Sequence, residues 1–376
     1  MTAPSYVDPV DGTTYPLDVP RWRSDAGRPL MVTALAGIGR ADIESRERSI
    51  WRYRAALPMA IAPVSLGEGC TPLIARDWDG MGLRFKLEWF APTASFKDRG
   101  AAVMVSYLRQ AGIPAILEDS SGNGGAAIAA FGAAAGMKVR ILCPATTQPA
   151  KVAQMRAFGA EVQLVPGPRE ESENEAIRQS ATRFYASHNW QAFFLQGTKL
   201  LAYELWEDLG FRAPDNVIIP CGAGSNVLGC DIGFSELRAA GQIDRLPRLF
   251  CVQPENVAPI HACFEAGADT LQPRDWQPTI AEGTAIKRPV RLKPVLDAIR
   301  RSGGATIAVS EDEIRAALRR LAAIGLYVEP TCAGAAAAAS RLIAAGRISP
   351  GETTIVLLTG TGLKASAFMT EFFGAG

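Results

Sequence analysis

The chain has 376 residues, of which 48% are hydrophobic and 20% charged, and its formal net charge is +1. This balance is typical of a globular enzyme and gives no basic surface of the kind that binds nucleic acid. No run of 18 apolar residues predicts a membrane span, and residues 1–5 lack the start of a secretory signal. Seven dispersed cysteines without a CxxC pair, and only two histidines, lead us to expect a cytoplasmic protein without a metal site.

Residues 1–50 differ from the rest, because 6–12 and 24–30 resemble two turns with little apolar periodicity. We predict an extended arm or small ribbon there, followed by a short helix near residues 50–53. Further on, alanine-rich helices alternate with apolar strands, which we place at 85–88, 141–144, 162–165, 217–220, 249–252 and 354–358. Such strands between helices indicate a parallel sheet covered on both faces. The whole series of strands and helices is too large for one α/β unit, so we expect two α/β domains with a cleft between them.

Four polar loops follow apolar strands, at the sheet edge where open α/β proteins bind ligands. The first, residues 94–100, contains Lys97 between an aromatic residue and an Asp-Arg pair. Out of full contact with water, an ammonium group has a lowered pKa and becomes an amine able to form a Schiff base. A lone lysine is more commonly a solvated surface residue, so the other loops decide between these two interpretations.

The other three loops each suit part of a phosphate-bearing ligand. Loop 120–125 precedes a helix, whose free N–H groups, with the loop hydroxyls, can bind a carboxylate. Loop 222–226 has glycines that let a phosphate approach, but Val227 breaks the GxGxxG pattern of dinucleotide sites. Loop 358–364 offers a hydroxyl at the end of the last strand. Each loop alone is ordinary turn chemistry, but with the lysine they predict pyridoxal 5′-phosphate (PLP).

Seven motifs extend this pattern over most of the chain: residues 66–73, 95–100, 120–125, 196–199, 222–226, 328–331 and 359–364. In their order and spacing, the chain resembles the threonine synthase branch of the tryptophan synthase β-type (fold type II) PLP-dependent enzymes. The resemblance covers roughly residues 65–370. The Asp-Arg-Gly after the lysine and the Thr-Gly-x-Gly-Leu-Lys ending are more similar to threonine synthases than to cysteine synthases.

The resemblance implies an α/β fold of two open, mostly parallel domains with PLP in the interdomain cleft. We expect residues 1–50 to form an N-terminal arm or degenerate ribbon without zinc, since this segment contains no cysteine. The large PLP-binding domain would comprise 51–98 and 190–376. The small α/β domain would comprise 99–189 and carry loop 120–125. The family also implies a homodimer.

The resemblance also assigns roles to individual residues. Lys97 would be the catalytic residue, as the Schiff-base lysine that also moves protons at the substrate carbons. The implied cofactor contacts are Lys97, Phe96, Asn123, Gly222, Ala223, Gly224, Ser225, Asn226 and Thr359. The implied contacts with a small amino-acid substrate are Ser120, Ser121, Gly124, Lys287 and Arg288, the last two as cations for a second phosphate. No metal ligand is implied.

The implied activity is that of a carbon–oxygen lyase, which eliminates phosphate from an O-phosphohomoserine-like substrate and adds water to give threonine. Three features depart from that pattern: loop 120–125 continues Gly-Gly-Ala instead of Thr-Ser-Ala, Thr361 stands where histidine is common, and 279–289 equally resembles amino-acid dehydratases. Alternatives are therefore a dehydratase or ammonia-lyase giving a 2-oxo acid and ammonia, or a β-replacement synthase of an unusual amino acid. Outside this class, a non-catalytic binding module or a nucleotide-dependent dehydrogenase remains possible.

Overall fold

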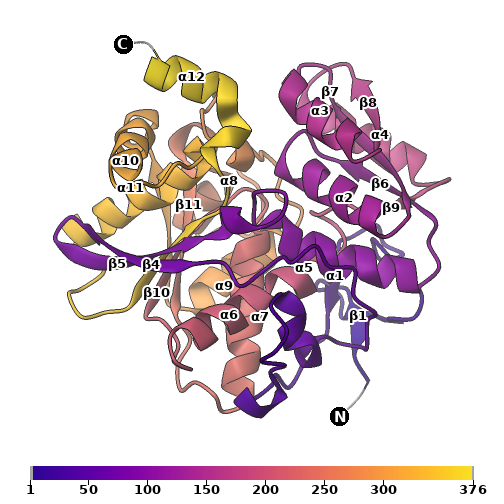
Figure 1. The fold of residues 1–376 in the computed structure, drawn as a ribbon, viewed down its shortest axis with the longest axis horizontal. Helices are drawn as coiled ribbons and strands as arrows, with labels where there is room; N and C mark the ends of the chain where they lie inside the picture. The colour runs from indigo at the N-terminus through magenta and orange to yellow at the C-terminus, as the bar shows by residue number, and fades with distance from the viewer. Residues whose placement is uncertain (1–2, 375–376) are drawn as a thin grey trace. The chain divides into compact units, whose positions relative to one another are not determined.

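The computed structural model describes residues 3–374, whose contacts fall into two units (Figure 1). Unit 1 comprises residues up to 70, 91–93 and 97–200, and unit 2 comprises 71–90, 94–96 and the residues from 201 onward. The chain therefore passes between the units several times, once at the peptide bond between Phe96 and Lys97. The domain division expected from the sequence, 1–50, 51–98 with 190–376, and 99–189, stays a prediction.

Unit 1 begins with a small antiparallel sheet in the order β2-β1-β3. Its strands are β1 (Ser5–Val7), β2 (Thr14–Pro16) and β3 (Met31–Val32), and the 3-10 helices η1 (Arg40–Asp42) and η2 (Ile50–Ala56) follow. Tyr6 of β1 is buried, and its hydroxyl donates to that of Tyr107 at 2.9 Å. The predicted ribbon is thus present and packs on the rest of unit 1.

A four-stranded parallel sheet in the order β8-β7-β6-β9 forms the centre of unit 1. Its strands are β6 (Ala115–Asp119), β7 (Lys138–Pro144), β8 (Glu161–Val165) and β9 (Phe184–Tyr185). The helices of unit 1 are α1 (Lys97–Gln110), α2 (Asn123–Ala134), α3 (Pro149–Ala157), α4 (Arg169–Gln179) and α5 (Ala192–Thr198). Helices α1 and α5 pack closely, because a Cβ on Gly100 would lie 2.5 Å from the ring of Phe194.

Unit 2 contains a six-stranded sheet in the order β12-β11-β10-β13-β5-β4. Its strands are β4 (Leu73–Trp78), β5 (Met81–Leu87), β10 (Asn216–Pro220), β11 (Arg248–Pro254), β12 (Ala305–Val309) and β13 (Thr354–Leu358). All neighbours are parallel except the edge pair β4–β5, which forms an antiparallel hairpin. The expected α/β class with mostly parallel sheets is confirmed.

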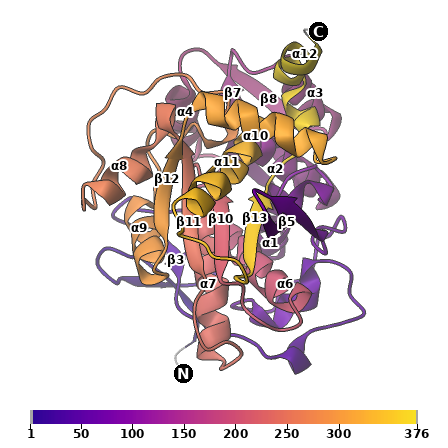
Figure 2. The ribbon, with the colours of Figure 1, turned by 90° about the vertical axis from the view of Figure 1, so that its left-hand side faces the viewer.

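The helices of unit 2 are α6 (Leu200–Asp208), α7 (Ser225–Ala239), α8 (Pro259–Glu265), α9 (Leu292–Arg301), α10 (Glu311–Ala323), α11 (Pro330–Ala344) and α12 (Ser366–Gly374). Short 3-10 helices are η3 (Glu88–Phe90), η4 (Glu255–Val257), η5 (Glu282–Thr284) and η6 (Gly362–Ala365). Figure 2 shows α11 crossing in front of β10, β11 and β13. Its buried alanines carry short side chains, so this helix lies close to the strands.

Among residues 3–374, no helix combines the length and apolarity that a membrane span requires. Within the same residues, no group of three or more His, Cys, Asp or Glu side chains is arranged to hold a metal ion.

Candidate active site

Helix α1 begins at Lys97 itself, so the predicted strand–loop–helix arrangement around this lysine is present. Asp98 holds the turn before it. The Asp98 carboxylate accepts hydrogen bonds from the backbone N–H of Thr93 at 2.6 Å and from the Thr93 hydroxyl at 2.5 Å. Lys97 is half-buried, and its Nζ lies 5.9 Å from the ring centroid of Phe194. The lysine is therefore held at a helix start with an aromatic face nearby.

Loop 120–125 connects β6 to α2, and Gly122 at the helix start supplies no capping side chain. The first N–H groups of a helix lack partners within the helix, so this terminus suits an anion. Ser120 is buried, whereas Ser121 and Asn123 are half-buried. Gly124 has no room for a side chain, since a Cβ there would lie 2.8 Å from Nδ1 of His188 and 2.9 Å from the Ser120 hydroxyl.

A buried acid–histidine pair lies beside this loop, and the sequence reasoning did not find it. Nδ1 of His188 lies 2.6 Å from Oε1 of Glu118, and the backbone N–H of His188 donates to Oε2 at 3.0 Å. Glu118 is inaccessible to solvent and His188 is 6% exposed. The neighbouring Asp119 accepts hydrogen bonds from the hydroxyls of Tyr185 and Ser187.

Burial sets the protonation of these groups. It raises the pKa of Glu118 to about 8, against the opposing effects of the His188 backbone N–H, Arg169 and Lys97. Burial, and then the charge of Lys97, lowers the pKa of His188 well below its ordinary value. Burial and the nearby Glu118 raise the pKa of Asp119 to about 6. The positive charge of Lys97 thus acts on the pKa of both members of the pair.

In unit 2, loop 222–226 follows β10 and leads into α7. Gly224 has a φ of +96°, a left-handed conformation that favours glycine, and a Cβ there would overlap Val295. Asn226 is 3% exposed, and neither atom of its side-chain amide has a hydrogen-bond partner within the described residues. Ala223 and Ser225 are half-buried in the same loop.

Thr359 lies directly after β13, as predicted, and next to Phe96. Its carbonyl accepts the backbone N–H of Phe96 at 3.0 Å, and the adjacent residues Ser95 and Gly360 form a β-bridge. Behind it, the buried thiol of Cys332 accepts the Thr359 N–H at 3.1 Å and lies 3.4 Å from the Thr359 hydroxyl. Burial raises the pKa of Cys332 to about 12, so it stays a neutral thiol.

The segment 279–289 lies against loop 222–226 within unit 2. A Cβ on Gly222 would lie 3.2 Å from the carbonyl oxygen of Gly283, and the Gly283 N–H donates to the Thr331 hydroxyl at 3.1 Å. Lys287 and Arg288, predicted as substrate cations, are exposed to solvent. Their part in a site stays a prediction.

The predicted site residues thus form two sets, each brought together within its own unit. Lys97, Asn123 and the carboxylate-loop residues belong to unit 1, whereas Phe96, the residues of loop 222–226, Thr359, Lys287 and Arg288 belong to unit 2.

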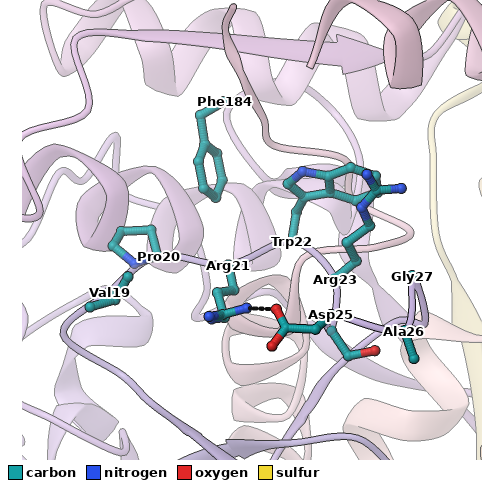
Figure 3. Close-up of a pocket in the computed structure, with 10 residues that line it drawn as sticks. Val19, Pro20, Arg21, Trp22, Arg23, Asp25, Ala26, Gly27 and Phe184 are labelled. Atoms are coloured by element: carbon teal, nitrogen blue, oxygen red, sulfur yellow. Dashed lines mark hydrogen bonds and ion pairs between the residues drawn. The ribbon is translucent and has the colours of Figure 1, made fainter. Parts of the chain in front are cut away.

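A separate open hollow of about 710 Å³ lies in unit 1, lined by residues 19–27 and Phe184 (Figure 3). Two of its lining residues, Arg21 and Asp25, form an ion pair at 2.7 Å. No predicted site residue lines this hollow.

A family model described as pyridoxal-phosphate dependent enzyme matches residues 64–360. The chain belongs to this family. It is 34% identical over 325 residues to a threonine synthase of Methanosarcina acetivorans, covering 84% of this chain and 80% of that protein. It is 34% identical over 333 residues to a threonine synthase of Methanocaldococcus jannaschii, covering 86% and 82% of the two chains.

Among solved structures, a fungal L-serine ammonia-lyase from Rhizomucor miehei superposes with a TM-score of 0.71 at 21% identity, covering 82% of this chain and 98% of that one. At this identity, the likeness supports the fold alone. With the family and the relatives, the chain is a PLP-dependent lyase similar to threonine synthases, and PLP is its cofactor. These expectations from the sequence are confirmed, and the binding-module and dehydrogenase alternatives are not needed.

The Glu118–His188 pair had only a weak signal in the sequence. Glu118 and Asp119 are two acids at the end of an otherwise apolar strand, where charges are costly unless they have partners. His188 lies 70 residues further along the chain, and no local pattern joins it to Glu118.

Proposed function

We propose that this PLP-dependent lyase is a threonine synthase, converting O-phosphohomoserine and water to threonine and phosphate. The observation that carries the proposal is the 34% identity to two threonine synthases over at least four fifths of both chains in each pair. Bound PLP supplies an electron sink for carbanions formed at the substrate carbons. The steps around it depend on residues of this chain.

The residues present fit a phosphate-bearing cofactor. The buried amide of Asn226, at the start of α7, has no hydrogen-bond partner among residues 3–374, which is costly unless a ligand supplies one. Gly222 and Gly224 let this loop pack closely against residues 283–286 and Val295, and Ser225 begins α7, whose first N–H groups suit a phosphate. We assign this loop, with Ala223, to the cofactor phosphate.

Lys97 is assigned to the covalent Schiff-base bond with the PLP aldehyde and to proton transfer at the substrate carbons. Phe96 and Asn123 would flank the cofactor, and the neutral hydroxyl of Thr359 would meet its ring nitrogen. A neutral partner does not stabilise a protonated ring as a carboxylate would, which favours elimination over transamination. Ser120, Ser121 and Gly124 would bind the substrate carboxylate at the start of α2.

One observation favours the second candidate, a dehydratase or ammonia-lyase. The cations proposed for a substrate phosphate, Lys287 and Arg288, are exposed to solvent. A hydroxy- or diamino-acid would need no such cations, and its product would be a 2-oxo acid with ammonia. The β-replacement synthase would differ only in the nucleophile that completes the reaction.

The deciding experiment incubates the PLP-loaded enzyme with O-phospho-L-homoserine and measures phosphate and threonine. We expect both products in equal amounts; 2-oxo acid from L-threonine or L-serine, with no phosphate release, would favour the ammonia-lyase instead. The Lys97→Ala variant should lose the absorbance band near ~415 nm expected of lysine-bound PLP, together with turnover. A band that persists in this variant would refute the assignment of Lys97.

The proposed setting is a cytoplasmic homodimer. Sedimentation equilibrium of the holoenzyme tests the dimer: a mass of one chain at micromolar concentration would contradict it.

A further inference from the structure

The Glu118–His188 pair has a defined arrangement of hydrogens. Oε2 of Glu118 accepts a hydrogen bond from the backbone N–H of His188, and Oε1 makes the contact with Nδ1. Burial keeps the carboxyl protonated and the imidazole neutral near pH 7. The hydrogen between them therefore belongs to Oε1, Nδ1 accepts it, and the ring carries its own hydrogen on Nε2.

The ring edge of His188 lies against the loop that we assign to the substrate carboxylate. Its Nδ1 and Cε1 atoms would lie 2.8 and 2.9 Å from a Cβ on Gly124. The Ser120 hydroxyl lies at the same spot, at 2.9 Å. Any other residue at position 124 would displace this imidazole, so the glycine and the histidine occur here as a matched pair.

The same imidazole lies near Lys97. The ring of Phe194 lies near both, with its centroid 5.8 Å from that of His188 and 5.9 Å from Nζ of Lys97. Nδ1 is engaged by Glu118, and the ring makes no hydrogen bond through Nε2 within residues 3–374. This buried imidazole, which lies against the loop, thus has one nitrogen fixed by an acid and the other without a hydrogen bond to the described residues.

We propose that His188, oriented by Glu118, is a substrate-binding residue that donates its Nε2–H to the α-carboxylate of the amino-acid substrate beside loop 120–125. The inference rests on the proposed function, because it takes this loop as the carboxylate site. On this proposal, the Glu118–His188 pair lets the enzyme distinguish an amino acid from its ester or amide. Glu118 acts through His188 and is a positioning residue.

Two substitutions separate the nitrogens of the ring. In His188→Asn the side-chain amide reaches the position of Nδ1 and keeps a partner for Glu118, but nothing reaches Nε2. In His188→Gln the longer amide returns a donor near the position of Nε2. We expect His188→Asn to raise KM for O-phospho-L-homoserine roughly 10- to 100-fold, as for the loss of a hydrogen bond to a charged group, with a smaller change in kcat. His188→Gln should recover most of the loss.

The pH dependence of KM tests Glu118. Other charged groups that act on the pair are Asp119 of β6, Lys97 of α1 and Arg169 of α4. When Glu118 ionises above about pH 8, Nδ1 takes the hydrogen and Nε2 becomes an acceptor, which repels a carboxylate. Wild-type KM should therefore rise above this pH. Glu118→Gln always donates to Nδ1, and its KM should lack this rise, while titration of the substrate affects both enzymes equally.

Binding without turnover separates this inference from the proposed function. The holoenzyme is titrated with L-threonine and with L-serine, and the change of the PLP absorbance band gives Kd for wild type and His188→Asn. If wild type binds either amino acid but does not release phosphate from O-phospho-L-homoserine, the proposed function fails while the ratio of Kd values still tests His188. An unchanged Kd, or a spectrum of wild type that responds to neither amino acid, would overturn the proposal. Should His188→Asn not fold, the Glu118→Gln pH profile decides alone.

Discussion

The site residues predicted in unit 1 and those predicted in unit 2 differ chemically. Around Lys97 and loop 120–125, unit 1 places ionisable groups: Glu118, Asp119 and His188. Around loop 222–226 and Thr359, unit 2 presents glycines, an amide, hydroxyls and a thiol that stays neutral. The difference separates two tasks: the neutral groups can hold a cofactor at any ordinary pH, whereas the groups of unit 1 respond to protons. Each of the following predictions tests one side of this contrast.

The largest effect is expected at Gly224 of unit 2. Gly224→Ala forces a left-handed conformation on alanine and pushes its Cβ into Val295, so we expect a loss of about 3 kcal/mol in the free energy of unfolding. Gly241, near the other end of α7, is the matched control, with a φ of +67° and no atom within 4 Å of a Cβ. Gly241→Ala should cost only about 1 kcal/mol. Urea denaturation measures the loss of unfolding free energy in both variants. Equal losses would show that Val295 moves aside at no cost in free energy.

The next effect belongs to unit 1 and depends on pH. The unfolded Glu118 has a pKa near 4.5 and the folded one about 8, so the folded state binds more protons between these values. Stability therefore falls as pH rises through this window, by at most ~1.4 kcal/mol per pH unit. Below about pH 6.5 the lowered pKa of His188 acts in the opposite direction, which leaves the net fall between about 6.5 and 8.

Glu118→Gln isolates this contribution, because the amide reproduces the protonated carboxyl. We expect the variant to gain stability relative to wild type by about 2 kcal/mol between pH 6.5 and pH 8.5, because only wild type loses stability through this window. Thermal or urea denaturation at both values gives the difference. A constant difference across this range would mean that Glu118 is ionised throughout.

The smallest effect is expected at Asn226. Its amide has no partner within the described residues, so Asn226→Ala should change the unfolding free energy of the PLP-free protein by less than ~0.5 kcal/mol. The Kd for PLP should nevertheless rise about tenfold, the equivalent of one good hydrogen bond. In Asn216, by contrast, the amide nitrogen donates to the Thr354 hydroxyl at 2.9 Å, and Asn216→Ala should destabilise by about 1 kcal/mol without a comparable effect on PLP. If Asn226→Ala lost more stability and less PLP affinity than Asn216→Ala, Asn226 would be a structural residue.

Much of the fold could be predicted from the sequence, because buried parallel strands leave a local record. The apolar runs at 141–144, 217–220 and 354–358 lie in β7, β10 and β13, and the loops that follow them are where the pattern placed them. The helix expected after loop 94–100 is present, but it begins within that loop, at Lys97. The β4–β5 hairpin was not predicted, since β4 has three consecutive exposed residues, 75–77, and lacks a continuous apolar run.

The ionisable part of the site could not be predicted, because its geometry depends on non-local pairing. Glu118 meets His188 only because β9 pairs with β6, which brings the residues after Tyr185 to the end of the strand that contains Glu118. A two-residue strand such as β9 gives almost no sequence pattern. The space at Gly124 is likewise set by the imidazole that lies against it.

The interleaved course of the chain has a consequence for how the protein can be cut or reassembled. The chain leaves unit 1 after residue 70, returns for 91–93, leaves again for 94–96 and re-enters at Lys97. No single cut of the backbone therefore yields either unit whole. A fragment starting at Lys97 would also lack Tyr6, whose hydroxyl bonds to Tyr107 and whose ring packs at 5.8 Å against Phe193. One unit therefore cannot be exchanged as a single continuous segment, and any chimaera with a relative must be joined at several crossover points at once.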